Sequence, residues 1–399
     1  MKRDSQAPTG AAFASRLAVF YSALCAVLGV QMPFLPIWFA AKGLDAVAVG
    51  VVLAIPLAVR LFAIPLASHL ADRFDAVRAV IVAGAAASLL GYAVLGFMHA
   101  PAAIMTAVAF ASIFYTPLMS LADAYALRGL ALHGRSYGPV RLWGSAAFIA
   151  GTLGGGILLD LIDPRALIWV VVGTMALNSA AACALSPLGE QSSAPRVMSA
   201  RVLLQDSRFV TAATAAGLIQ ASHALYYGFS ALQWRAAGYD GATIGTLWTV
   251  GVVAEIVLFA ISARLALDPT MLLFAGAAGG VARWAAMAFD PPAALLLLLQ
   301  WLHALSFGAT HLGALAFVAR RAPAGLGASA QGYLAVALAL AMTGAMGVSG
   351  ELYARWQSGA YWAMAALAAL GGLVLLAGAL CGGGRVRCDC ADERVSSQG

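Results

Sequence analysis

The stretch Gln300-Trp-Leu-His-Ala-Leu-Ser-Phe-Gly-Ala-Thr-His-Leu312 places two histidines inside a segment that is otherwise apolar enough for a lipid bilayer. At about 100° per residue, one sector of a helix would carry the polar and aromatic positions Gln300, His303, Phe307, Thr310 and His311. A helix with an apolar back and a polar front at membrane depth needs other protein or a water-filled cavity to receive that front. The stretch therefore predicts a membrane protein whose other helices enclose a cavity.

The composition of the whole chain agrees with this prediction. Of its 399 residues 62% are hydrophobic and only 10% are charged, with a mean hydropathy of +0.88. Such a chain has too little polar surface for a soluble globule, so it is an integral membrane protein. The first apolar segment, residues 17–40, is too long for the apolar core of a signal peptide and is expected to be the first span.

The apolar segments predict an all-α fold of twelve transmembrane helices. They lie near residues 16–41, 46–70, 77–98, 101–127, 139–160, 165–186, 208–235, 241–266, 270–289, 292–319, 327–349 and 358–381. If the N-terminus is cytoplasmic, most basic residues fall in cytoplasmic segments. The only basic residues in segments on the opposite side of the membrane are Lys42, Arg165, Arg235 and Arg355, and those within spans are Arg60 and Arg283. The positive-inside rule then places both termini in the cytoplasm.

A polar connection rich in Ser and Pro divides the twelve spans into two groups of six. We expect an N-terminal bundle at residues 1–187, a cytoplasmic linker at 188–206, a C-terminal bundle at 207–384 and a cytoplasmic tail at 385–399. The two halves also share a short repeat, because Ala41-Lys-Gly-Leu-Asp45 returns 195 residues later as Ala236-Ala-Gly-Tyr-Asp240. Duplicated halves of six helices are typical of secondary transporters.

The loop after the second span carries a family resemblance. Ser68-His-Leu-Ala-Asp72-Arg73-Phe-Asp75-Ala-Val-Arg78 resembles the motif Gly-x-Leu-Ala-Asp-Arg-x-Gly-Arg-x-Arg of the major facilitator superfamily, with Ser68 and Asp75 at the usual glycine positions. The resemblance covers nearly the whole chain and implies two bundles that rock about a central site. Asp72 would accept hydrogen bonds from a neighbouring helix start and Arg73 would stay at the headgroups, so that both act in gating.

Further motifs resemble the phenylpropionate permease branch of that superfamily. They are Tyr137-Gly-Pro-Val-Arg-Leu-Trp-Gly-Ser145, and Leu302-His303 with Phe307 and His311; the segments 117–123 and 251–255 also look like that branch. The resemblance implies proton symport of an aromatic carboxylate such as 3-phenylpropionate across a bacterial inner membrane.

Asp123 and Arg141 bracket the loop between the fourth and fifth spans and are expected at an inner gate, with a static loop clamp as the alternative.

Three titratable residues within spans are candidates for proton coupling: Glu255, His303 and His311. An ionised carboxylate at membrane depth is unfavourable unless it is hydrated, paired or protonated. Burial favours its protonated form and an approaching cation favours its ionised form, so alternating exposure would load and unload a proton. The alternative is structural, with Glu255 in a permanent interhelical pair and the histidines stabilising helix contacts.

Arg60 is the candidate for binding the substrate carboxylate, because a guanidinium stays charged and has planar donors that match a carboxylate. Its alternative is an ion pair with an acid at mid-membrane depth, and Arg283 is expected to be structural. Further residues expected to line the substrate site are Gln31, Tyr226, Gln300, Phe307 and Gln331, with packing as the alternative for each. Tyr227 and Trp234 are additional amphipathic side chains on the same predicted helix as Tyr226.

Other functional classes lack support in the sequence. His303 and His311 lie eight residues apart, roughly 12 Å along a helix, so they cannot share one metal ion. No catalytic residues, cofactor or metal site are predicted, and the scattered basic residues argue against nucleic-acid binding.

The expected partners are a small-molecule substrate, protons and the lipid bilayer, with the protein a monomer. Two alternatives stay open: a proton-coupled carrier of a neutral sugar or nucleoside, which predicts that Arg60→Lys is tolerated, and a transport-inactive sensor or assembly factor.

Overall fold

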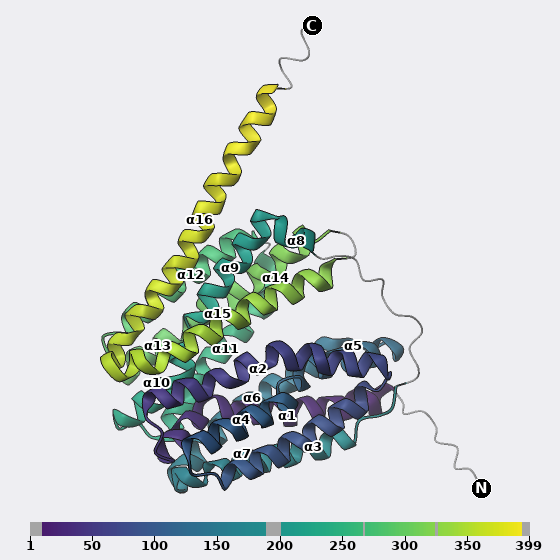
Figure 1. The fold of residues 1–399 in the computed structure, drawn as a ribbon, viewed down its shortest axis with the longest axis vertical. Coiled ribbons are helices and arrows are strands. Elements are labelled where there is room, and N and C mark those ends of the chain that lie inside the picture. Colours follow the sequence, from purple (N-terminus) through teal and green to yellow (C-terminus); the bar gives the residue numbers. More distant parts are fainter. Residues whose placement is uncertain (1–9, 189–200, 266–267, 324–325, 393–399) are drawn as a thin grey trace, which may run out of the picture. The chain divides into compact units, whose positions relative to one another are not determined.

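The computed structural model describes residues 10–188, 201–265, 268–323 and 326–392, and every regular element in them is a helix (Figure 1). The first seven α-helices and one short turn are α1 (Gly10–Ala41), α2 (Ala46–Arg73), α3 (Val77–Gly96), α4 (Pro101–Tyr115), α5 (Leu118–Leu132), α6 (Tyr137–Leu161), η1 (Pro164–Ala166) and α7 (Leu167–Cys183). The all-α prediction is confirmed. The N-terminal residues 1–9, residues 189–200 of the predicted linker and the last seven residues of the predicted tail lie outside the described part.

The remaining helices begin within the predicted linker. They are α8 (Arg201–Gln205), α9 (Ser207–Ala221), α10 (Ala224–Ala236), α11 (Gly241–Leu265), α12 (Pro269–Met287), α13 (Ala293–Trp301), η2 (Ala304–Ala309), α14 (Thr310–Arg321), α15 (Gly327–Trp356), η3 (Gln357–Ala360) and α16 (Tyr361–Asp392). Each predicted span coincides with one of these helices or with consecutive ones. Helix α16 continues into the predicted tail.

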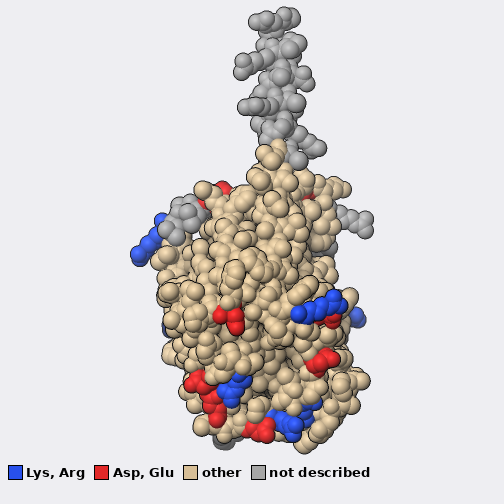
Figure 2. Space-filling model, turned by 90° about the vertical axis from the view of Figure 1, so that its left-hand side faces the viewer, with Lys and Arg blue, Asp and Glu red and all other residues tan. Residues whose placement is uncertain are grey.

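Ten stretches of the described chain are long and apolar enough to cross a membrane. One of them, Ser329–Leu380, includes most of α15 and the first part of α16, whereas α9 and α10 are too short to qualify singly. The face shown in Figure 2 agrees with a lipid environment, because charged side chains on it are few and leave a broad uncharged area above them. The twelve-helix arrangement and the cytoplasmic termini stay predictions.

Three of the predicted spans are interrupted. Helix α4 ends before Pro117, which lacks an N–H and cannot continue the helical hydrogen bonds. Helices α9 and α10 are separated at Ser222 and His223, where the Ser222 hydroxyl turns back to the Ile219 carbonyl at 2.6 Å. In the predicted span 292–319, α13 and α14 are joined by η2, which is a π-helix. A local π-helix widens the turn and is frequent at functional sites.

The chain folds into two compact units. The first comprises residues 1–194 and 226–249, and the second comprises residues 195–225 and 250–399. In the first unit α1 packs on α6 and α7, and α3 packs on α4 and α7. In the second unit α9 packs on α15 and α16, and α12 packs on α16, α14 and η2. The bundle boundaries expected from the linker stay a prediction.

The repeated Ala-x-Gly-x-Asp segment folds the same way in both places. Gly43 has φ +90° and Gly238 has φ +88°, in the left-handed region that favours glycine. After each glycine an aspartate caps the next helix, with the Asp45 carboxylate 2.8 Å from the Ala48 nitrogen and the Asp240 carboxylate 2.7 Å from the Thr243 nitrogen. The repeat therefore encodes one turn geometry twice.

Within the first unit, α6 and α11 are joined at their ends. The Asp160 carboxylate accepts the N–H of Gly241 at 2.8 Å and the N–H of Ala242 at 3.2 Å, and it pairs with Arg235 at 2.7 Å. The two backbones touch, because a Cβ on Gly241 would lie only 2.2 Å from the Gly156 carbonyl oxygen. Small residues of this kind let membrane helices approach closely.

Candidate functional site

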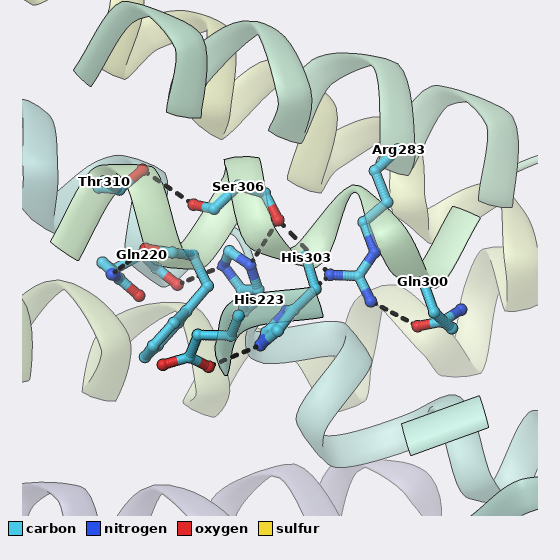
Figure 3. A network of polar contacts seen from close by, with 9 residues as sticks. Gln220, His223, Arg283, Gln300, His303, Ser306 and Thr310 are labelled. Carbon is cyan, nitrogen blue, oxygen red and sulfur yellow. Dashed lines mark hydrogen bonds and ion pairs between the residues drawn. The ribbon is translucent and has the colours of Figure 1, made fainter. Parts of the chain in front are cut away.

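A buried guanidinium lies at the centre of a polar network in the second unit (Figure 3). Arg283 on α12 has no exposed surface, and its two terminal nitrogens contact different residues of the next helices. Nη1 lies 2.9 Å from His303 Nδ1, and Nη2 donates to Gln300 Oε1 at 2.6 Å. Gln300 in turn donates to the Leu296 carbonyl at 3.1 Å. The packing of α12 against η2 thus holds a full positive charge between neutral side chains.

The Arg283 contact determines the tautomer of His303. A guanidinium only donates hydrogen bonds, so His303 Nδ1 must be the acceptor and the neutral ring carries its hydrogen on Nε2. His303 Nε2 lies 3.7 Å from Glu255 Oε2, within ion-pair range but longer than a hydrogen bond. The N–H of His303 therefore faces the carboxylate. While Arg283 occupies Nδ1, the ring has no nitrogen that can take a second proton.

A second histidine extends the network toward α9. His223 Nδ1 lies 3.1 Å from the Gln220 carbonyl oxygen and must donate to it, so His223 Nε2 accepts from the Ser306 hydroxyl at 3.1 Å. The Ser306 oxygen also accepts from Arg283 Nη1 at 3.5 Å. A continuous series of polar contacts therefore connects Gln220 on α9 with Glu255. It passes through the side chains of His223, Ser306, Arg283 and His303 in that order. His223 was not among the residues predicted from sequence, although it shares with His303 the signal of a histidine within a predicted span.

The π-helix η2 aligns three rings on one side of the segment. The His303 and Phe307 rings are stacked at 5.2 Å and 12°, and the Phe307 and His311 rings are stacked at 6.0 Å and 10°. Residues four apart on an α-helix drift by about 40° per step, and the wider π turn reduces this drift. The sequence predicted that His303, Phe307 and His311 share one face of a regular α-helix. In the structure they do lie on one side, but the segment that carries them includes the π-helix η2. Gln220 reaches the same segment, donating to the Phe307 carbonyl at 3.4 Å.

The network has a defined charge balance. Arg283 contributes one positive charge, and an ionised Glu255 contributes one negative charge across the neutral His303 ring. Protonation of Glu255 would remove the negative charge and leave the network with a net positive charge. Buried charges are strongly unfavourable without compensation. Arg283 supplies the positive charge of this network, and the structural role expected of it from sequence stays a prediction.

Arg60 lies half-buried on α2 in the first unit. In the described part of the chain its guanidinium makes no hydrogen bond or ion pair. Gln31, another predicted lining residue of this unit, donates to the Tyr92 hydroxyl. The ion pair that was the alternative for Arg60 is thus not seen among the described residues, and its donors stay available for an anion.

The structure brings Asp123 and Arg141 around one tyrosine. The Asp123 carboxylate accepts from Tyr21 at 2.6 Å and from Tyr137 at 2.8 Å. The Arg141 guanidinium lies 5.6 Å from the Tyr21 ring centroid and contacts Cys25 Sγ at 3.8 Å. The two charged groups thus share Tyr21 without a direct ion pair between them. Their gating role stays a prediction.

The other predicted gating and lining residues lie apart from these clusters. Asp72 and Arg73 are exposed at the end of α2, and the Asp72 side chain makes no hydrogen bond or ion pair with a described residue. The nearby pair is instead Asp75 with Arg128, at 2.8 Å. Gln331 is exposed on α15. The capping contact expected of Asp72 is absent from this conformation among the described residues, and its role stays a prediction.

Comparison with known proteins gives the family. Residues 14–365 match the family described as "MFS_1 like family". The chain belongs to this family. The chain is 32% identical over 314 residues to the "Probable 3-phenylpropionic acid transporter" of Escherichia coli (strain K12), covering 76% of the chain and 82% of that relative. It is also 27% identical over 360 residues to the "Maltose permease" of Geobacillus stearothermophilus, covering 86% of the chain and 88% of that relative.

Solved structures show the same fold at low sequence identity. The nucleoside transporter NupG matches with a TM-score of 0.80 and 16% identity, covering 92% of this chain and 98% of that one. A POT family transporter solved with a thioalcohol-conjugated peptide matches with a TM-score of 0.68 and 11% identity, covering 91% and 94%. This member of the MFS_1 like family is thus a multi-pass membrane transporter of small molecules and not an enzyme.

Proposed function

We propose that the protein is a proton-coupled symporter of a small aromatic carboxylate such as 3-phenylpropionate. The observation that carries the proposal is the arrangement of Arg283, His303 and Glu255 in one buried network. It combines a permanent cation with a carboxylate that can bind a proton, at the depth of predicted spans. The E. coli relative named as a probable 3-phenylpropionic acid transporter supports the choice of substrate.

In this proposal Glu255 carries the proton. His303 presents its Nε2–H to the ionised carboxylate and orients it, while Arg283 compensates its charge. When Glu255 takes up a proton, the charge of Arg283 is no longer balanced, and an anion binds more favourably to the protein. Release of the anion restores the preference for an ionised Glu255. Proton and carboxylate are thus bound and released together, which is symport. His311, at the end of the ring stack, is the second candidate for accepting the proton.

Arg60 would bind the substrate carboxylate. Its planar donors match a carboxylate in a bidentate geometry, and it has no competing acid among the described residues. In the same unit, Tyr226 would cover the aromatic ring and the amide of Gln31 would contact a polar group of the substrate. Asp72, Arg73, Asp123 and Arg141 would act at the gates of an alternating-access cycle.

The membrane topology belongs to the same proposal. Counting α15 and α16 separately and adding α9 with α10 to the other stretches gives twelve crossings. An even number of crossings places both termini on one side, and the distribution of arginines makes that side the cytoplasm. The protein would act as a monomer in a bacterial inner membrane, in two bundles at residues 1–187 and 207–384, and without a cofactor or nucleic-acid partner.

A neutral solute such as a sugar or nucleoside is the second candidate substrate. The maltose permease relative supports it, as do the Gln and His side chains of the network, which bind hydroxyl groups well. This alternative gives Arg60 no anion to bind. A transport-inactive sensor or assembly factor is the remaining alternative, and it predicts no ligand-dependent thermal stabilisation that varies with pH.

Uptake into proteoliposomes tests the proposal. Wild-type protein should accumulate labelled 3-phenylpropionate when an inward proton gradient is imposed and should only equilibrate it without one. Arg60→Lys should weaken uptake by about tenfold or more, because the bidentate geometry is lost. No uptake of this acid by wild type, with uptake of maltose or a nucleoside that Arg60→Lys leaves intact, would establish the neutral-solute carrier instead.

A further inference from the structure

An aromatic cluster on α10 and α11 of the first unit is not used by the coupling network. We call Tyr226, Tyr227, Trp234 and Trp248 the ring cluster. The Tyr226 and Trp248 rings are stacked at 4.8 Å and 26°, and the Trp248 ring also lies 5.8 Å from that of Tyr227. Trp234 meets Tyr226 edge-on at 6.0 Å. Tyr226, Trp234 and Trp248 are buried, with at most 3% of their surface exposed.

Three buried polar atoms on the same two helices have no hydrogen-bond partner among the described residues: Ser230 Oγ, Trp248 Nε1 and Thr249 Oγ1. Ser230 lies four residues after Tyr226 and four before Trp234, so it shares their face of α10. The Tyr226 and Trp234 rings that flank this position in the chain meet edge-on at 6.0 Å. Thr249 directly follows Trp248 on α11.

These unpaired groups differ from their counterparts elsewhere in the protein. The buried Trp38 donates its N–H to the Arg165 carbonyl at 3.0 Å, and the buried Trp284 donates to the Ser222 hydroxyl at 2.8 Å. The buried Ser112 donates to the Val108 carbonyl at 2.6 Å within its own helix. Buried donors are normally paired, and unpaired ones are unfavourable. A stacked pair of rings with unpaired donors at its edge is therefore suited to an aromatic ligand that carries a polar atom on its ring.

We infer that the ring cluster is the subsite for the aromatic ring of the substrate, and that it selects rings bearing a hydroxyl group. The inference rests on the proposed function, in which the carboxylate end is bound elsewhere. The indole N–H of Trp248 only donates, so it requires an acceptor on the ligand. The hydroxyls of Ser230 and Thr249 both donate and accept, and a phenolic hydroxyl can satisfy either kind of group. Hydroxyaryl carboxylates are the substrate class that fits.

The placement of the cluster in the chain agrees with a role in transport. Helix α10 begins directly after His223, and α11 also carries Glu255, so each helix is next to or holds a member of the polar network along the chain. In this structure the rings contact one another, and the ring of a ligand would enter where Tyr226 meets Trp248. Tyr227, which is half-buried beside Trp248, lies at the edge of this stack.

Competition for uptake of labelled 3-phenylpropionate tests the inference. Unlabelled 3-(3-hydroxyphenyl)propionate or 3-(4-hydroxyphenyl)propionate should compete at a concentration about threefold to tenfold lower than unlabelled 3-phenylpropionate, the effect of one added hydrogen bond. Trp248→Phe keeps the ring and removes the N–H, so it should abolish this preference, and the hydroxylated and unsubstituted acids should then compete at concentrations within about twofold of each other. Ser230→Ala should reduce the preference in the same direction. Trp38→Phe, whose N–H is used by a backbone carbonyl, is the matched control and should keep the preference.

Equal competition by the hydroxylated and unsubstituted acids in wild type would overturn the inference, as would an undiminished preference in Trp248→Phe. If wild type takes up neither acid, the proposed function fails by itself. The ring subsite is then judged with two neutral compounds that differ only in the ring hydroxyl, 2-(4-hydroxyphenyl)ethanol and 2-phenylethanol. Greater thermal stabilisation by the first, lost in Trp248→Phe, supports the subsite; equal or absent stabilisation by both overturns it.

Discussion

Arg283 Nη1 lies 2.9 Å from His303 Nδ1, and this contact decides which nitrogen of the imidazole faces Glu255. Because the guanidinium can only donate, the ring presents an N–H to the carboxylate. A histidine fixed in this way orients and stabilises an ionised acid but cannot take up its proton. The proton-coupling role that sequence analysis shared among Glu255, His303 and His311 is thus assigned in our proposal first to Glu255.

Replacement of His303 distinguishes an orienting residue from a proton carrier. His303→Gln keeps one donor and one acceptor but has no proton to exchange. We expect uptake to be slower while substrate accumulation still follows an imposed proton gradient. The measurement is the uptake rate and the steady-state accumulation at two gradients. Persistent exchange with loss of gradient dependence in His303→Gln would show that the histidine itself carries the proton.

Arg283 should also be important for stability. Arg283→Gln removes the donors to His303, Gln300 and Ser306 and leaves Glu255 without its compensating charge, so we expect a loss of about 3 kcal/mol or more. The measurement is thermal unfolding in detergent. Arg355→Gln is the matched control, because Arg355 pairs with Glu351 on an exposed helix surface and should contribute less than about 1 kcal/mol. Equal losses for both variants would contradict the central role of Arg283.

The joint between α6 and α11 should depend on the Asp160 carboxylate. Asp160→Ala removes the acceptor for Gly241, Ala242 and Arg235, and we expect a destabilisation of about 2 kcal/mol. The nearby Asp163→Ala removes only the cap on the Arg165 nitrogen and should cost about 1 kcal/mol or less. Thermal unfolding of the two variants compares them directly. A smaller effect for Asp160→Ala than for Asp163→Ala would argue against the joint.

The two glycines of the repeated turn should respond equally to substitution. Gly43→Ala and Gly238→Ala force a side chain into the left-handed region, at a cost of about 1 kcal/mol each. Neither position has a neighbouring atom within 4 Å of an added Cβ, so the effect isolates the backbone strain. Gly154→Ala, in open space within α6, is the control and should be neutral or stabilising. Unequal losses at 43 and 238 would contradict a shared geometry.

The features that could be predicted from sequence are those set by local periodicity. Apolar runs predicted where the long helices lie, and the repeated Ala-x-Gly-x-Asp segment indicated a duplication; the common turn geometry of its two copies is seen only in the structure. The spacing of His303, Phe307 and His311 also predicted a common side. These features depend on residues close together in the chain, so the pattern itself contains them.

Contacts between helices could not be predicted in the same way. The pairing of Arg283 with His303 depends on how α12 packs against η2, which no local pattern specifies. The π-helix itself was missed, because its residues read as a regular helix. His223 was overlooked because a single histidine in an apolar segment is usually a satisfied interior residue. Its significance appears only when Ser306 and Arg283 lie beside it.

The measurement that tests the central claim most directly is transport by Glu255→Gln in proteoliposomes with labelled 3-phenylpropionate. We predict that the variant loses accumulation driven by a proton gradient but retains exchange of internal for external substrate, because a neutral amide holds the network in the form that favours the anion. Glu351→Gln, at an exposed acid on α15, should behave as wild type. Accumulation by Glu255→Gln at the wild-type level would show that the coupling proton resides on another group.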